Sequence, residues 1–214
     1  MKNLFTTLLL PLLLATGAAQ ALPIVSLSNV GDVTTSVAGA TSIDFNSGCG
    51  YATCTSDFAL VNGSQGGKYA QPFGVNSQYL TVPNPSPTTK SASFNLDTAA
   101  DYFGLFWGSI DSYNFISFYL GNSLVASYSG GDIVGQFANG NQLSYSSNRY
   151  INFDFGSDSY DSVKLTSNGF AFESDNHAFR ALVSVSEPAS SLLLLIGLAG
   201  LFLARRRVRM NRRH

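Results

Sequence analysis

Residues 115–128 read FISFYL, then GN, then SLVASY, and this stretch decides the fold class. The two runs are rich in aromatic and aliphatic residues, and only Gly121 and Asn122 separate them, which is the spacing of a two-residue β-hairpin. Glycine at the first central position supplies the positive φ that a type II′ turn needs. The sequence therefore predicts strands at 115–120 and 123–128.

The same pattern continues on both sides of this hairpin. Gly, Ser, Asn and Asp punctuate residues 22–184 roughly every 8 to 12 residues, as in all-β domains. Further strands are predicted for the alternating runs at 41–45, 91–96, 150–155, 162–166 and 169–173. Residues 63–87 and 130–141 are expected to be mostly loop. We therefore expect an all-β domain at 22–184, a two-sheet β-sandwich of jelly-roll type.

The N-terminus has the features of a cleavable secretory signal peptide. Lys2 gives a basic start, Leu4–Leu14 is an apolar run, and Ala19-Gln20-Ala21 is an A-x-A cleavage signal. Residues 1–21 are thus predicted to be removed on export. A first transmembrane helix is the alternative, and the short apolar run followed by a cleavage site disfavours it.

The C-terminal tail, residues 185–214, combines an apolar run with a basic end. The uncharged run 189–204 is followed directly by Arg205, Arg206 and Arg207. As a helix it spans about 24 Å, and snorkelling arginine side chains can make up the difference to a ~30 Å hydrocarbon core. The positive-inside rule keeps the arginines cytoplasmic, so the β-rich domain is expected on the far side of the membrane.

This arrangement resembles the PEP-CTERM proteins, bacterial exports handled by exosortase, a membrane-embedded sorting protease. The resemblance covers residues 185–207. It implies that Glu187 and Pro188 form the recognition element, that about 189–204 is the membrane helix and that Arg205–Arg207 stop transfer. A plain single-span anchor without processing remains the alternative, because an apolar helix followed by arginines is a general stop-transfer pattern.

A second resemblance lies inside the β-rich domain. Residues 102–114 read YFGLFWGSIDSYN and residues 172–176 read FESDN. These two segments, in this order, resemble a subgroup of exosortase-dependent surface proteins. What the subgroup implies is a small surface sandwich of unassigned biochemical activity; it does not imply an enzyme.

The charge distribution excludes one class of partner. Residues 22–186 hold five basic residues against twelve carboxylates, a net charge of −7, whereas the whole chain has −1. Such an acidic domain offers no counter-charge to phosphate, so we expect no nucleic-acid binding.

The two cysteines of the chain are Cys49 and Cys54. An exported protein matures in an oxidising compartment, so we predict a disulfide that closes this short loop. A zinc site is disfavoured because two thiols with no histidine nearby supply only half of the ligands.

Trp107 and its aromatic neighbours allow two interpretations. Alternating aromatics predict a buried strand, and this is the interpretation that we favour. The alternative is a sugar-stacking platform, in which Asp111, Tyr113 and Asn114 of the following loop supply hydrogen bonds. That alternative makes the domain a carbohydrate-binding module.

Four oxygen-bearing residues form a candidate calcium site. Glu173 and Asp175 are two apart and project to the same face of a strand, where like charges repel unless a cation or donors lie between them. Jelly-roll modules that this domain resembles often hold a structural calcium between their first and last strands, which implies Asp44, Asn46, Glu173 and Asp175 as ligands. A solvated acidic face is the interpretation that we favour, since no contiguous calcium loop is present.

No catalytic motif is present in the sequence. His177, the one histidine of the β-rich domain, is expected to be structural. If paired carboxylates made the domain a secreted glycoside hydrolase, Glu173 would be the first acid to suspect. We expect instead a non-enzymatic surface or matrix protein that is an inner-membrane precursor before exosortase sorts it. The resemblance implies that the protein is associated with exopolysaccharide or a biofilm.

Overall fold

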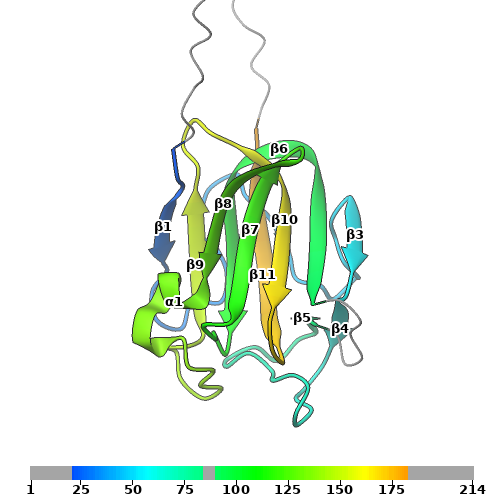
Figure 1. Ribbon diagram of the computed structural model, residues 1–214, viewed down its shortest axis with the longest axis vertical. Coiled ribbons are helices and arrows are strands. Elements are labelled where there is room, and N and C mark those ends of the chain that lie inside the picture. The colour runs from blue at the N-terminus through cyan, green and yellow to red at the C-terminus, as the bar shows by residue number, and fades with distance from the viewer. Residues whose placement is uncertain (1–20, 84–89, 183–214) are drawn as a thin grey trace, which may run out of the picture. The chain divides into compact units, whose positions relative to one another are not determined.

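The structure, a computed structural model, describes residues 21–83 and 90–182. The described part of the chain is mostly β, as predicted, and its strands form one antiparallel sheet (Figure 1). The strands are β1 (Ile24–Leu27), β2 (Thr41–Ile43), β3 (Thr53–Ser56), β4 (Ala59–Val61), β5 (Tyr79–Val82), β6 (Ser91–Gly108), β7 (Asn114–Leu120), β8 (Ser123–Ser129), β9 (Arg149–Asp154), β10 (Tyr160–Ser167) and β11 (Phe172–Ala181). The predicted signal peptide, apart from Ala21, and the whole predicted tail 185–214 lie outside the described residues.

The long strand β6 organises this sheet, because its two halves have different partners. Residues 91–95 pair with β10, and within them 92–95 also pair with β3. Residues 102–107 pair with β9 on one side, and the same half of the strand pairs with β11 on the other. Asp97 and Thr98, between the two halves, are exposed. One strand thus carries the chain from one group of partners to the other.

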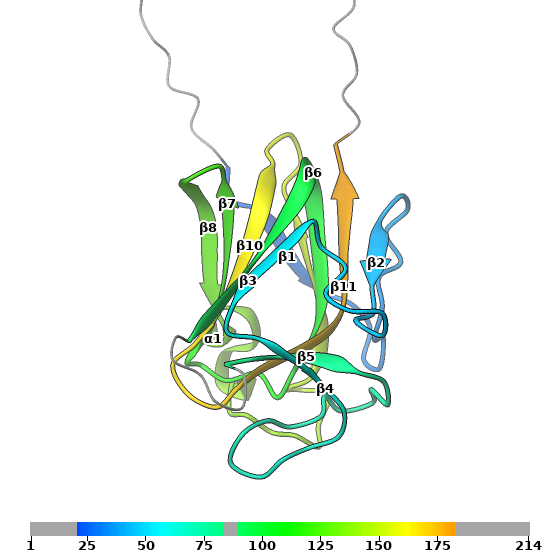
Figure 2. The ribbon, with the colours of Figure 1, turned by 90° about the vertical axis from the view of Figure 1, so that its right-hand side faces the viewer.

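The sheet folds back on itself around an aromatic core. Figure 2 shows β7, β8 and β10 on one side of the domain and β2 and β11 on the other. Phe118 of β7 meets Phe153 of β9 with ring centroids 4.9 Å apart and Phe103 of β6 at 5.5 Å. Burying such large apolar side chains between the two groups of strands is the main source of stability here.

The hairpin predicted at 115–128 is confirmed. Strands β7 and β8 pair with Leu120 opposite Ser123, so the turn holds two residues. Gly121 has a φ of +58°, which fits the type II′ turn, and its N–H donates to Asp161 at 2.8 Å.

The loop regions hold short elements that the sequence pattern did not predict. Strand β5 lies inside the expected loop 63–87, and a five-residue helix, α1 (Gly130–Val134), opens the expected loop 130–141. Ser129 caps α1, and the Asp132 side chain accepts from the Ser129 N–H in return. The short 3₁₀ helix η1 (Gly135–Phe137) follows. Elements of this length have too few residues to show a periodicity.

The predicted disulfide between Cys49 and Cys54 is present, with Cα atoms 6.6 Å apart. Both cysteines pack against the core cluster beside β3. In residues 21–83 and 90–182, no helix has the length and apolar character needed to cross a bilayer.

Candidate functional site

Trp107 lies in the core and is not available as a sugar-stacking platform. The side chain is fully buried, and its ring stacks on Phe172 of β11 with centroids 4.2 Å apart and an interplanar angle of 14°. The buried-strand interpretation is therefore confirmed. Alternation along β6 points Trp107 to the inner face of the sheet.

Tyr113 and Asn114 support the segment that precedes β11. Asn114 is buried, and its amide Nδ2 donates to the Ala171 carbonyl at 2.8 Å. The Tyr113 hydroxyl donates to the Phe170 carbonyl at 2.9 Å. Tyr113 and Asn114 thus hold the backbone of residues 170–171 in position next to the start of β11.

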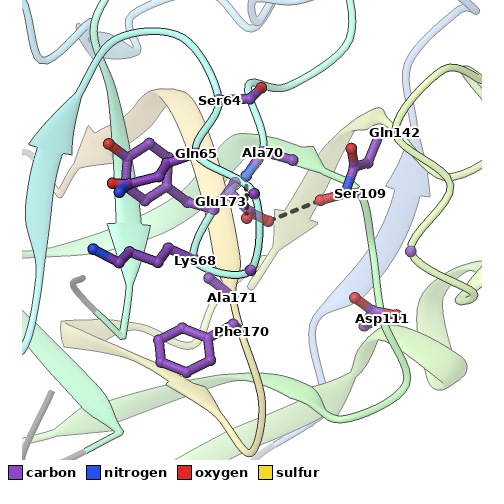
Figure 3. A pocket seen from close by; sticks show the side chains of 14 residues that line it. Ser64, Gln65, Lys68, Ala70, Ser109, Asp111, Gln142, Phe170, Ala171 and Glu173 are labelled. Carbon is purple, nitrogen blue, oxygen red and sulfur yellow. Dashed lines mark hydrogen bonds between the residues drawn. The ribbon is translucent and has the colours of Figure 1, made fainter. Parts of the chain in front are cut away.

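Asp111, the remaining residue of the predicted ligand site, lines a pocket of about 230 Å³ (Figure 3). The walls of this loop-end pocket come from the segments 64–70, 109–111, 140–142 and 170–173. Figure 3 shows Lys68 and Phe170 on one side of Glu173, and Asp111 and Gln142 on the other. Four segments that are distant in sequence therefore meet at one site.

Glu173 forms the floor of the loop-end pocket. Its side chain is 2% exposed. Oε1 accepts from the Ala70 N–H at 2.9 Å, and Oε2 accepts from the Ser109 hydroxyl at 2.8 Å. Burial raises the pKa of the Glu173 carboxyl to about 7, although both hydrogen bonds favour the ionised form. The group is thus poised between its two protonation states near neutral pH.

Asp111 stands in the wall of the same pocket, and burial raises the pKa of its carboxyl. Gly140 makes room for that carboxyl, because a Cβ at position 140 would come within 2.7 Å of Oδ1 of Asp111. Gly140 also has a φ of +68°, a conformation that L side chains rarely adopt. The charge of Asp111 raises the pKa of Glu173 further, which shows that the two carboxyls share one electrostatic environment.

The four predicted calcium ligands do not come together in the structure. Asp44 accepts from the Asn46 side chain at 3.0 Å, and both residues are exposed. Asp175 accepts from the Ser77 hydroxyl at 3.1 Å, whereas Glu173 faces the pocket. Within residues 21–83 and 90–182, no three histidine, cysteine, aspartate or glutamate side chains are arranged to hold a metal ion.

The favoured expectation of a solvated acidic face is also wrong. Glu173 and Asp175 are both buried, because residues 64–78 fold back over that face of β11 and supply the donors Ala70 N–H and Ser77 hydroxyl. Burial raises the pKa of Asp175 to about 6. The two carboxylates thus fasten a long loop to the sheet.

His177 is structural, as expected. It is fully buried on β11, with Nδ1 hydrogen-bonded to the Tyr51 hydroxyl at 2.7 Å and Nε2 to the Ser174 hydroxyl at 2.9 Å. Burial lowers its pKa to about 3, so the imidazole is neutral at physiological pH. Phe45 and Phe103 pack against its ring.

Several residues of the pocket carried no signal in the sequence. Ser109, Lys68, Gln142 and Phe170 belong to loops, and no motif singles out one serine or glutamine among many. Gly66 and Gly67 marked residues 63–87 as a loop, but not as a wall of this pocket. Among the residues of the pocket, only Asp111 and Glu173 were predicted as site residues from the sequence. Asp111 was assigned to a sugar-binding site and Glu173 to a calcium site.

We expect Glu173→Gln to become more stable relative to the natural protein as pH rises. The glutamine can accept from Ala70 N–H and donate to Ser109, and it does not titrate. Burial raises the folded-state pKa of Glu173 from 4.5 to about 7, so its contribution to stability is full below pH 4.5 and is lost as pH rises through 7. The divergence is about 3 kcal/mol. Urea unfolding at pH 4.5 and pH 8 measures it, and a constant difference would contradict the burial argument.

Comparison with known proteins gives no relative: no family model matches the chain, and neither a curated protein nor a solved structure matches it. The two resemblances to exosortase-dependent proteins therefore stay predictions.

Proposed function

We propose that the chain is an exported surface or extracellular-matrix protein that an exosortase-type protease sorts through its C-terminal tail. In this proposal, residues 1–21 direct export and the apolar run 189–204 holds the precursor in the inner membrane. The basic end 205–214 stays cytoplasmic, and Glu187 and Pro188 are recognised for cleavage. The β-rich domain then remains outside the cytoplasm, in association with exopolysaccharide. It needs no catalytic activity for this role.

The observation that supports the export step of this proposal is the disulfide between Cys49 and Cys54. Disulfides persist in oxidising compartments and are rare in the cytosol, which agrees with the signal peptide predicted for residues 1–21. The acidic, lysine-poor composition of residues 22–186 also suits an extracellular domain, and it gives nucleic acid no basic surface.

We propose further that the domain is a jelly-roll type of β-sandwich. The two halves of β6 have different pairing partners, and Phe118 of β7 packs against Phe153 of β9. A strand that passes from one group of partners to another is how sandwiches turn corners. A carbohydrate-binding module built on Trp107 loses support, because that side chain is buried.

Intact-mass measurement of the mature protein tests the sorting proposal. In cells that contain the sorting protease, we expect a product that begins at Leu22 and ends near Ser186–Pro188, and in cells without it we expect the tail to be kept. Glu187→Ala should retain the tail even when the protease is present, whereas the flanking control Ser186→Ala should be processed normally. A product that keeps His214 in both strains would make the protein a plain membrane-anchored domain.

A further inference from the structure

The loop-end pocket has the size of a site for one small ligand. Its volume of about 230 Å³ lies below the roughly 300–1,000 Å³ that is typical of pockets for drug-sized molecules. That volume suits one ring with its substituents.

The charges of the pocket disfavour an ionic ligand. Lys68 is the only basic residue among the described residues that line the pocket, and the carboxyls of Asp111 and Glu173 line it too. A phosphate or carboxylate ligand would therefore find little positive charge to pair with. A metal ion lacks a third suitable side chain in the described part of the chain. A neutral polar molecule is the class that remains.

The hydrogen-bonding groups suit a molecule with many hydroxyls. Asp111 accepts hydrogen bonds, whereas the amides of Gln65 and Gln142 both accept and donate. Glu173 uses one acceptor position on each oxygen for Ala70 and Ser109, and a carboxylate has about four such positions in all. The floor and both sides of the pocket therefore carry groups that can hydrogen-bond to the hydroxyls of a ligand.

Phe170 adds an apolar surface beside these polar groups. Its side chain is 51% exposed, although it is large and apolar, and it lines the pocket next to Lys68 (Figure 3). The hydrogen bonds from Tyr113 to the Phe170 carbonyl and from Asn114 to the Ala171 carbonyl hold this segment in place. An aromatic ring on a backbone segment held in this way, beside hydroxyl-binding groups, matches the two sides of a sugar, its apolar C–H face and its hydroxyls.

We propose that the loop-end pocket binds one neutral sugar residue, with Asp111 and Gln142 bonding its hydroxyls and Phe170 stacking on its apolar face. The site shares Asp111 with the sugar-stacking platform predicted around Trp107, but its aromatic ring is Phe170. It also goes beyond the sorting proposal, because sorting depends on the tail and sugar binding depends on the β-rich domain.

Strand β11 separates the floor of the loop-end pocket from Leu182, the last residue that the structure describes. Glu173 lies near the start of β11 and Leu182 follows its end, roughly 30 Å away at about 3.3 Å per residue. Glu173 at the pocket floor and Leu182 are thus at opposite ends of β11.

Saturation-transfer NMR on the full chain in detergent tests the proposal. The probes are the methyl glycosides of glucose, galactose, mannose and N-acetylglucosamine, with galacturonate, glucosamine and glucose 6-phosphate as charged counterparts. We expect transfer to at least one neutral glycoside. Asp111→Asn and Phe170→Ser should each weaken that binding roughly tenfold, the effect of about 1.4 kcal/mol.

Matched control variants separate the pocket from the rest of the surface. Phe137→Ser removes a similar ring, 45% exposed in η1, and Asp97→Asn removes an exposed carboxylate; both should bind like the natural protein. Thermal melting of each variant confirms folding, and Phe170→Ser keeps the test valid if Asp111→Asn unfolds. The proposal is overturned if no neutral glycoside receives transfer, if a charged probe binds instead, or if folded pocket variants bind as well as the controls.

Discussion

Replacing Phe118 by alanine is expected to lower the free energy of unfolding by about 4 kcal/mol, the range for a buried phenylalanine that leaves a cavity. Phe118 is fully buried, and its ring centroid lies 4.9 Å from that of Phe153, 5.0 Å from Phe155 and 5.2 Å from Tyr160. These neighbours belong to both sides of the folded sheet and cannot all move into the space. Urea unfolding measures the loss, with the fluorescence of the single tryptophan as the probe.

The control for this prediction lies on the same hairpin. Leu124 of β8 is 56% exposed, so Leu124→Ala removes an aliphatic side chain without opening an internal cavity. We expect it to cost below about 1 kcal/mol. If the two variants were equally destabilised, Phe118 would not hold the two sides of the sheet together.

The second large effect is a loss of stability in acid that depends on His177. Burial lowers its folded-state pKa from 6.5 to about 3, so the stability from keeping it neutral is full above pH 6.5 and is lost as pH falls towards 3. Between pH 6.5 and 4 the loss is about 3 kcal/mol, at about 1.4 kcal/mol per pH unit. Protonation would place a charge between Tyr51, Ser174 and aromatic rings, with no carboxylate hydrogen-bonded to the imidazole.

A comparison with His177→Gln isolates this effect from the two buried carboxyls. Glu173 and Asp175 have raised folded-state pKa values of about 7 and about 6, so they favour the folded state more as pH falls and partly hide the loss. Both carboxyls are present in the natural protein and in the variant, so their contributions cancel in the difference between the two free energies of unfolding. We expect the variant to be about 2 kcal/mol less stable at pH 7. That gap should close near pH 5 and reverse by about 1 kcal/mol at pH 4, because the natural protein loses about 3 kcal/mol over that range. A gap that stayed constant would show that His177 is already charged or solvated in the folded protein.

Alternation along the strands predicted which residues share a face, but not what covers each face. Glu173 and Asp175 project to the same side of β11, as expected from their spacing. Their surroundings depend on residues 64–78, which the sequence showed only as a loop. For the same reason Trp107 had two open interpretations, since an alternating strand has an inner and an outer side and the pattern alone does not distinguish them.

The β class, the turn at Gly121 and the disulfide between Cys49 and Cys54 could all be predicted from the sequence. These features depend on neighbouring residues, through turn chemistry, alternation and a short loop. Only the tertiary structure decided that Asp111 and Glu173 share a pocket and that His177 is neutral in the core. The floor of the pocket is built by two hydrogen bonds to Glu173. One comes from Ser109, which is 64 positions away in the sequence, and the other from Ala70, which is 103 positions away. Burial by these distant segments sets both the position and the pKa of the Glu173 carboxyl. Local patterns carry no record of such distant contacts, because they arise only when the sheet folds and the loops close over it.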